Sequence, residues 1–155
     1  MAESTDNERL GVFLAEDHTL VREGIAALIA SADGMDVVGE TGDGLQVVDM
    51  VHDTGPDVVV LDLGMPGLNG VDICRQLRRK TRKVNILVLT MHADEMFIVR
   101  ALESGASGYL LKNAATDQLI EAVRTVARGH LFLGPGVPRG VLSRLADGGE
   151  SDPLA

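Results

Sequence analysis

Val58-Val59-Val60-Leu61 is a purely apolar run followed directly by a carboxylate, and it decides the fold of this chain. Two similar runs lie on either side of it, Val12-Phe13-Leu14-Ala15 and Ile86-Leu87-Val88-Leu89. None has the polar alternation of a strand with one solvated face. Each therefore predicts a strand buried on both faces, which is typical of a parallel sheet covered by helices. Val37-Val38 and Tyr109-Leu110-Leu111 are weaker candidates for two further strands.

Apolar residues at helical spacing fill the segments between these runs. The clearest stripes consist of Val21, Ile25, Leu28 and Ile29, and of Leu119, Ile120, Val123, Val126 and Ala127; shorter ones consist of Leu45, Val48 and Val51, of Val71, Cys74 and Leu77, and of Phe97, Ile98, Ala101 and Leu102. Helix stops follow at Gly55-Pro56, Ser104-Gly105 and Gly129. This alternation, from Leu10 to about Arg128, predicts an α/β fold with a doubly wound, five-stranded parallel sheet built as (βα)5.

Composition restricts the classes of partner. The 155 residues include 14 Lys and Arg against 23 Asp and Glu, a formal net charge of −9, with no Trp, one Tyr and three Phe. This argues against a surface that neutralises many phosphates and against aromatic platforms for single-stranded nucleic acid. The lone Cys74 excludes an intramolecular disulfide and a cysteine-based zinc site, and fits a reducing cytosol. Met1–Arg9 lacks the apolar core of a signal peptide and no stretch is long enough to span a bilayer, so we expect a cytoplasmic protein without membrane contact.

The chain divides into three expected parts. Residues 1–8 are polar and are expected to form a flexible N-terminus, and residues 9–129 form the folded domain. Residues 130–155 are expected to be a linker with a short helix and a polar tail. Within them, Gly134-Pro135-Gly136-Val137-Pro138 reads as linker and Val141 to Ala146 as one or two helical turns.

The residues that follow the strands carry the chemistry, because ligands of an open α/β sheet bind beyond the carboxyl ends of its strands. Glu16-Asp17, Asp62, Thr90 and Lys112 occupy these positions. Clustered carboxylates favour a hard cation such as Mg²⁺, and a carboxylate beside Mg²⁺ can attack phosphorus. The lysine ammonium and the threonine hydroxyl would bind phosphoryl oxygens. The set therefore predicts a site for Mg²⁺-dependent phosphoryl transfer.

With their flanking residues, these strand ends resemble the receiver domain of two-component response regulators, most closely the NarL/FixJ-like subfamily that carries a C-terminal LuxR-type helix-turn-helix. The resemblance covers about residues 10–129. It rests on Ala15-Glu16-Asp17-His18, Leu61-Asp62-Leu63-Gly64-Met65-Pro66-Gly67, Leu89-Thr90-Met91 and Gly108-Tyr109-Leu110-Leu111-Lys112. It implies the flavodoxin-like strand order 2-1-3-4-5, and a signalling protein that catalyses only its own phosphorylation and dephosphorylation.

The resemblance also implies a role for each residue. Asp62 would accept a phosphoryl group from a sensor histidine kinase. Mg²⁺ would be held by Glu16, Asp17, a carboxylate oxygen of Asp62 and the backbone carbonyl of Gly64, while Thr90 and Lys112 would bind the phosphoryl oxygens. Tyr109 would then turn from an exposed to a buried orientation and change the face made by the fourth helix, fifth strand and fifth helix, so that dimerisation and transcription are controlled.

Three positions depart from common receiver patterns. Asn113 follows Lys112 where many receivers have a cis-proline. Gly64, two residues after the phosphoacceptor, has no side chain to shield the phosphoryl group from water, and His92 stands two residues after Thr90. These departures concern the lifetime of the phosphoryl group and not the site itself. The histidines at 18, 52, 92 and 130 show no ligand spacing and are interpreted as surface or packing residues.

Other functional classes fit this pattern less well. A phosphohydrolase similar to the haloacid-dehalogenase family needs an acid two residues after the nucleophile, where this chain has Gly64. A flavodoxin-like cofactor carrier would have Glu16-Asp17 in its phosphate loop, where they would repel the phosphate. A receiver-like module that is not phosphorylated and only binds partners remains as an alternative.

Partners follow from the resemblance. A homodimer could form through the first and fifth helices, with Leu20, Ile120 and Val123 as candidates if exposed, or through the face of the fourth helix, fifth strand and fifth helix. DNA would be bound only through a C-terminal domain missing from this chain, because residues 130–155 are too few to fold alone. A basic cluster of Arg75, Arg78, Arg79, Lys80, Arg82 and Lys83 could bind anions, but a solvated helix end is favoured over that reading.

Overall fold

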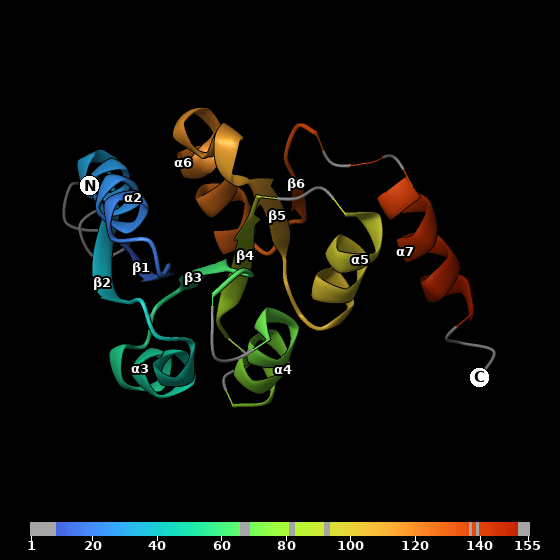
Figure 1. Cartoon of the computed structure of the whole chain (residues 1–155), viewed down its shortest axis with the longest axis horizontal. Helices are drawn as coiled ribbons and strands as arrows, with labels where there is room; N and C mark the ends of the chain where they lie inside the picture. The colour runs from blue at the N-terminus through green and yellow to red at the C-terminus, as the bar shows by residue number, and fades with distance from the viewer. Residues whose placement is uncertain are drawn as a thin grey trace, which may run out of the picture.

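The computed structural model describes residues 9–65, 69–80, 83–91, 94–136, 138 and 140–151. All strands of its sheet are parallel, and their order is β2-β1-β3-β4-β5-β6 (Figure 1). The strands are β1 (Leu10–Ala15), β2 (Met35–Thr41), β3 (Val58–Asp62), β4 (Asn85–Thr90), β5 (Gly108–Leu111) and β6 (Phe132–Leu133). The strand order and the five predicted strands are confirmed.

The predicted number of strands is wrong, because the sheet has a sixth strand. β6 consists of only Phe132 and Leu133, which is too short to give a recognisable apolar run. Its backbone nevertheless extends the sheet: the amide of Phe132 donates to the carbonyl of Ser107 at 3.1 Å, and that of Gly134 donates to the carbonyl of Tyr109 at 3.0 Å. The parallel sheet therefore continues into the segment that was expected to be linker.

Helices cover both faces of the sheet. They are α2 (Thr19–Ser31), α3 (Val47–Thr54), α4 (Gly70–Lys80), α5 (Glu95–Glu103), α6 (Ala115–Ala127) and α7 (Gly140–Ser151). α2 and α6 lie together on one face, and α3, α4 and α5 lie on the other (Figure 1). The doubly wound arrangement predicted from the sequence is thus present.

The two apolar cores explain why β1, β3 and β4 show no polar alternation. Val12 and Leu14 of β1 belong to the core beneath α2 and α6. Phe13 and Ala15 belong to the core beneath α3, α4 and α5. Because successive side chains point to opposite faces and both faces are covered, every position of the strand is apolar.

The end of α3 agrees with the sequence prediction, but its start does not. Gly55 ends α3 in the left-handed conformation, with φ 60°, which a residue without a Cβ adopts without strain. Leu45 was assigned to the apolar stripe of α3. It lies instead in a 3-10 turn, Gly44–Gln46, and is 64% exposed.

The segment after β6 contains a long helix. α7 begins at Gly140 and packs against α5 (Figure 1). Its residue Val141 is fully buried in the core. The predicted turns at Val141 to Ala146 are thus part of a longer helix that is attached to the domain. Within the described ranges, none of the helices combines the length and apolar character that a bilayer crossing needs.

Candidate functional site

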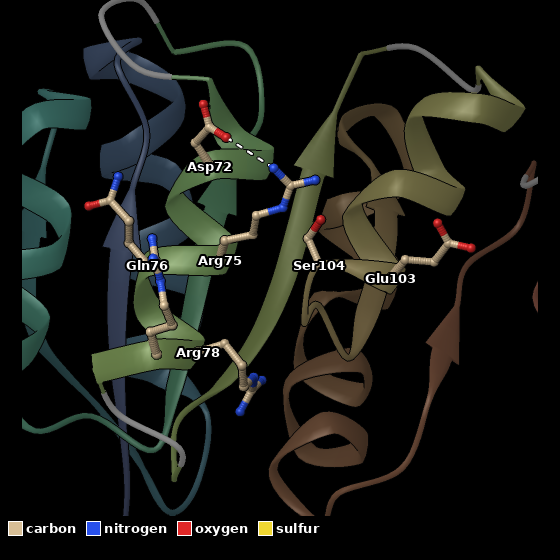
Figure 2. A pocket seen from close by; sticks show the side chains of 7 residues that line it. Asp72, Arg75, Gln76, Arg78, Glu103 and Ser104 are labelled. Carbon is tan, nitrogen blue, oxygen red and sulfur yellow. Dashed lines mark ion pairs between the residues drawn. The ribbon is translucent and has the colours of Figure 1, made fainter. Parts of the chain in front are cut away.

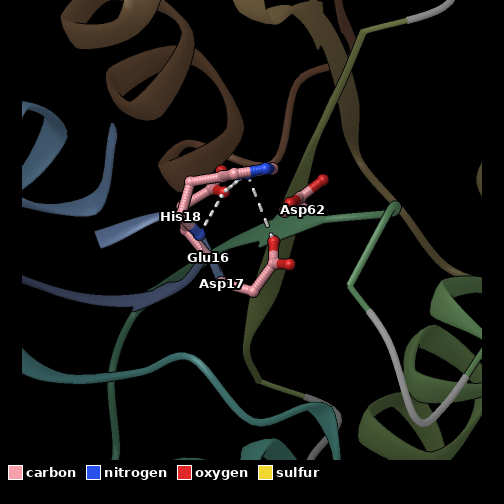
Figure 3. A group of neighbouring side chains, drawn as sticks. All are labelled: Glu16, Asp17, His18 and Asp62. Carbon is pink, nitrogen blue, oxygen red and sulfur yellow. Dashed lines mark hydrogen bonds and ion pairs between the residues drawn. The ribbon is translucent and has the colours of Figure 1, made fainter. Parts of the chain in front are cut away.

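Four side chains meet at the carboxyl edge of the sheet (Figure 3). Glu16, Asp17 and His18 follow β1 directly, and Asp62 is the last residue of β3. β1 and β3 are neighbours, and their register pairs Ala15 with Leu61, so the next residue of each strand brings a carboxylate to the same edge. Ligand atoms of all four side chains lie within 4.8 Å of one another. The structure therefore brings together the three carboxylates singled out in the sequence.

Lys112 neutralises part of this charge. Its Nζ lies 3.0 Å from Oε1 of Glu16 and 3.0 Å from Oδ2 of Asp62. Glu16 is fully buried and Asp62 is 2% exposed, so both carboxylates need a partner to remain charged. Burial by itself lowers the pKa of Lys112, but the hydrogen bonds and charges of Glu16 and Asp62 outweigh it, and the pKa lies above its ordinary value. The ammonium group is therefore held in its charged form.

The site keeps an excess of negative charge. Three carboxylates (Glu16, Asp17 and Asp62) and one ammonium leave a formal charge of −3 + 1 = −2. Oδ1 of Asp17 is buried without a hydrogen-bond partner, and Oε1 of Glu16 makes no hydrogen bond although Lys112 lies beside it. Oxygen donors with unmet acceptor capacity and surplus charge fit a hard divalent cation such as Mg²⁺. The residues present thus suit the predicted ion.

Gly64 leaves the approach to Asp62 open. Its backbone amide donates to Oδ1 of Asp62 at 2.8 Å, which fixes the orientation of the carboxylate. Gly64 is exposed, and a Cβ at this position would meet only Oδ1 of Asp62, at 3.5 Å. Asp62, the candidate phosphoacceptor, is therefore buried at the edge of the sheet, and Gly64 has no side chain that could shield it from water.

Thr90 and Tyr109 lie next to each other on neighbouring strands. Thr90 ends β4 and is 4% exposed, while Tyr109 lies on β5 opposite Val88 and is fully buried. A side-chain hydrogen bond joins them. Burial raises the pKa of Tyr109 to about 12, a shift that the Thr90 hydrogen bond opposes and the charge of Asp94 reinforces. Tyr109 thus adopts the buried one of the two orientations that the resemblance implied.

His18 belongs to the cluster, although its sequence position gave it only a surface or packing role. Its Nδ1 lies 3.0 Å from Oε2 of Glu16 and 3.4 Å from Oδ1 of Asp17, and its backbone amide donates to Oε2 of Glu16 at 3.0 Å. The signal available in the sequence was its position directly after the two acids. His92, two residues after Thr90, lies outside the described residues.

The basic residues of α4 form a separate surface (Figure 2). Together with the end of α5 they line an open groove of about 1030 Å³, whose residues are Asp72, Arg75, Gln76, Arg78, Arg79, Glu103 and Ser104. Arg75 pairs with Asp72 at 3.5 Å, and Arg78 donates to the carbonyl of Gly105 at 2.7 Å. These acidic and backbone partners favour the helix-end interpretation over an anion site. Arg82 of the same cluster lies outside the described residues.

Cys74 is a core residue, as predicted. It is fully buried on α4, and burial raises the pKa of its thiol to about 12, against an opposing effect of Arg78. The thiol is therefore protonated at neutral pH and takes no part in the site.

Comparisons with known proteins agree with this geometry. The family model "Response regulator receiver domain" matches residues 12–124. The chain is 37% identical over 142 residues to the transcriptional regulatory protein DegU of Brevibacillus brevis, a match that covers 92% of this chain and 60% of that protein. It is 39% identical over 125 residues to the oxygen regulatory protein NreC of Staphylococcus carnosus, covering 80% of this chain and 58% of the relative. The chain thus spans about 60% of the length of these relatives.

Solved structures show the same likeness. A LuxR-family two-component response regulator from Aurantimonas sp. SI85-9A1 superposes with a TM-score of 0.82 at 32% identity, covering 89% of this chain and 99% of that one. The signal receiver domain of the putative response regulator NarL from Mycobacterium tuberculosis gives a TM-score of 0.76 at 31% identity, covering 79% of this chain and 99% of that one. The chain therefore belongs to the response regulator receiver domain family, within the group of NarL- and LuxR-type regulators.

Proposed function

We propose that Asp62 is the residue of this receiver domain that accepts a phosphoryl group, with Mg²⁺ as cofactor. One observation supports this most directly: the Asp62 carboxylate lies among Glu16, Asp17 and the Lys112 ammonium at the carboxyl edge of the sheet. A buried carboxylate beside both a cation site and an ammonium group is suited to attack phosphorus, because the incoming phosphoryl charge is offset on two sides.

The chemistry follows from these positions. A carboxylate oxygen of Asp62 forms a bond to phosphorus, and the bond from phosphorus to the imidazole nitrogen of the donor histidine breaks, so that the imidazole leaves and takes up a proton. Glu16, Asp17, Asp62 and the carbonyl of Gly64 would hold Mg²⁺, which would supply positive charge for the phosphoryl oxygens. Lys112, now shared by Glu16 and Asp62, turns its ammonium group to one of those oxygens, and Thr90 donates its hydroxyl to another.

The proposed partners are a sensor histidine kinase, a second copy of the chain, and DNA through a further domain. Response regulator receiver domains interact with sensor kinases, which supports the first. For the α2–α6 dimer, Leu20 is 84% exposed and Ile120 is partly buried. Val123 is fully buried and is removed from the candidates, because α6 turns it into the core. The face formed by α5, β5 and α6 is a second proposal for the dimer interface. We also propose that the protein is cytoplasmic.

Response regulator receiver domains are signalling proteins and not metabolic enzymes, and this chain belongs to that family. The position that a phosphohydrolase needs for its acid holds Gly64, which donates only its backbone amide to Asp62. Hydrolysis of its own phosphoryl group is the only turnover we propose.

Intact-mass analysis after incubation with acetyl phosphate tests the proposal. We expect one phosphoryl group per chain in the presence of Mg²⁺, and none in Asp62→Asn or after chelation of the metal. Asp57→Asn is the matched control, because that aspartate directly precedes β3, at the end of the strand opposite to Asp62. Absence of any modification in the unaltered protein would favour a receiver-like module that only binds partners, and modification of Asp62→Asn would place the phosphoacceptor elsewhere.

A further inference from the structure

The peptide that joins Glu16 to Asp17 carries two of the four side chains in the cluster at the carboxyl edge (Figure 3). The amide of Glu16 donates to the carbonyl of Thr41, the last residue of β2, at 3.0 Å, which continues the pairing of β1 with β2 by one residue. The carbonyl of Glu16 accepts a hydrogen bond from a side chain, Nη1 of Arg22, at 2.6 Å. The orientation of the peptide that carries both carboxylates therefore depends on Arg22.

Arg22 reaches this carbonyl from the first turn of α2. Its own amide donates to the carbonyl of His18 at 2.8 Å, which closes that turn. Its Nε lies 3.3 Å from Oε1 of Glu40 on β2, and its side chain is 21% exposed. A guanidinium group is planar and holds its donors in a fixed arrangement. One side chain thus connects α2 and β2 to the segment that follows β1.

Gly42 provides the space for the guanidinium group. A Cβ at this position would lie 2.7 Å from Nη1 of Arg22, but at the ordinary distances of 3.5 Å from the carbonyl oxygen of Glu16 and 3.6 Å from Cα of Asp17. Gly42 does not have a positive φ, so its backbone tolerates a side chain. Among the described residues, the only close contact that a methyl group there would create is therefore with the end of the Arg22 side chain.

We propose that Arg22 is a positioning residue of the metal site, which holds the carbonyl of Glu16 and so orients the peptide from which the carboxylates of Glu16 and Asp17 extend. Groups that orient metal ligands contribute to metal affinity although they do not contact the ion. The inference rests on the proposed function for the presence of Mg²⁺ at this edge. It adds a residue that acts on the ion through the backbone.

The sign of the effect separates positioning from simple electrostatics. Arg22 is a cation beside a site with a surplus of negative charge, and it is paired with Glu40. If only its charge mattered, its removal would make the surroundings more negative and would tighten Mg²⁺ binding. If it positions the ligands, its removal weakens Mg²⁺ binding.

Calorimetric titration of the unphosphorylated chain with Mg²⁺ measures this effect. We expect Arg22→Met to weaken binding about tenfold, and Arg22→Lys, which keeps a donor, to weaken it less. Arg9→Met is the matched control. Arg9 likewise donates to a backbone carbonyl, that of Met35, and to a carboxylate, that of Asp36, but it lies at the opposite end of β1 and β2. Its replacement removes the same charge and should leave Mg²⁺ affinity unchanged.

Gly42→Ala tests the same contact while Arg22 stays in the chain. The added methyl group should displace the guanidinium group and weaken Mg²⁺ binding about as much as Arg22→Met does. In the double variant the methyl group no longer meets the arginine, so the loss should not exceed that of Arg22→Met alone. Losses that add in the double variant would show two independent disturbances of the fold and would overturn the inference.

The rate of modification by acetyl phosphate gives a second measurement. In Arg22→Met the Mg²⁺ concentration that gives half of the maximal rate should rise, while the rate at saturating Mg²⁺ stays close to that of the unaltered protein. Equal or tighter Mg²⁺ binding in Arg22→Met would overturn the inference, as would a fall confined to the saturated rate.

The titration uses no phosphoryl donor, and this keeps the two proposals apart. A chain that binds Mg²⁺ through an Arg22-dependent site but is not modified at Asp62 would refute the proposed phosphoryl transfer and leave this inference standing. Modification of Asp62 with Mg²⁺ affinity unchanged in Arg22→Met would do the reverse. Absence of Mg²⁺ binding in the unaltered protein would overturn both.

Discussion

Nζ of Lys112 lies 3.0 Å from Oδ2 of Asp62, although the two residues are 50 positions apart in the chain. The same nitrogen lies 3.0 Å from Oε1 of Glu16. One ammonium group therefore connects the segments that follow β1 and β5 to the end of β3, and its 9% exposure shows that water contributes little to this contact. The stability of this edge of the sheet and its chemistry therefore both depend on the ammonium group of Lys112.

Replacing Lys112 by methionine should destabilise the fold in the absence of Mg²⁺. The change leaves Glu16 and Asp62 buried without their ammonium partner, which costs about 3 kcal/mol when one member of a buried pair is removed. Urea unfolding measures the loss, with Lys80→Met, at an exposed position of α4, as the control. Added Mg²⁺ should recover more stability in Lys112→Met than in the unaltered protein. Equal losses in both variants would contradict the prediction.

Asp17→Ala should weaken Mg²⁺ binding and slow phosphorylation together, because the same ion serves both. Oδ1 of Asp17 is buried without a hydrogen-bond partner and lies 3.4 Å from Nδ1 of His18, so its loss removes the proposed metal ligand together with this contact. Calorimetric titration with Mg²⁺ and the rate of modification by acetyl phosphate are the two measurements. Asp53→Ala, whose side chain is 80% exposed, should leave both unchanged. Unaltered metal affinity in Asp17→Ala would remove Asp17 from the ligands.

Thr90→Ala should leave phosphorylation of Asp62 intact but prevent its effect from reaching Tyr109. The threonine hydroxyl is hydrogen-bonded to Tyr109, whereas Asp62 and Lys112 do not depend on it for their contact. We expect Asp62 still to be modified. The fluorine NMR resonance of a fluorotyrosine incorporated at position 109, the single tyrosine position, should no longer respond to modification. Thr90→Ser keeps the hydroxyl and should retain the response. A response of normal size in Thr90→Ala would disprove the coupling.

Tyr109 should make the stability of the fold depend on pH in the alkaline range. Its pKa is raised from 10.0 to about 12, so the folded state favours the neutral phenol. The contribution is complete below pH 10 and is lost as the pH rises toward 12. The raised pKa of Lys112 acts in the same direction, so the comparison is made with Tyr109→Phe. The difference in unfolding free energy between the two proteins should shrink between pH 10 and 12, and a constant difference would contradict a buried phenol.

Gly64→Leu should lengthen the lifetime of the phosphoryl group by several-fold. A Cβ at this position meets only Oδ1 of Asp62 at an ordinary distance, and the glycine does not have a positive φ, so the backbone tolerates the change. The larger side chain would then cover the approach of water to Asp62. Loss of the phosphoryl group is followed by intact mass after removal of acetyl phosphate. Equal lifetimes in Gly64→Leu and Gly64→Ala would show that cover at this position is irrelevant.

Much of the fold is predictable because a parallel strand buried on both faces is apolar at nearly every position, which makes it recognisable in the sequence. The run Val58-Val59-Val60-Leu61 is apolar throughout since both faces of β3 are covered, and the residue after it must lie at the carboxyl edge. The position of Asp62 beside Glu16 then follows from the adjacency of β1 and β3. The site could be predicted for this reason and not because any single residue is distinctive.

What the sequence did not reveal depends on contacts between distant segments. β6 exists because Phe132 and Leu133 return to the edge of β5, and two residues hold no periodic pattern. The burial of Val141 depends on where α5 lies, as does the pairing of Arg144 with Glu95. Val123 belongs to the predicted apolar stripe and was a dimer candidate only if exposed; the rotation of α6 against the sheet places it in the core.

The burial of Cys74 has a practical consequence for measuring motion. It is the only cysteine of the chain, and its thiol, with a pKa of about 12, stays protonated and out of reach of modifying reagents at neutral pH. A cysteine introduced at the exposed Leu142 would be the single reactive thiol of the molecule. A spin label or dye attached there would follow α7 in the otherwise native chain, without first removing a native cysteine from the core.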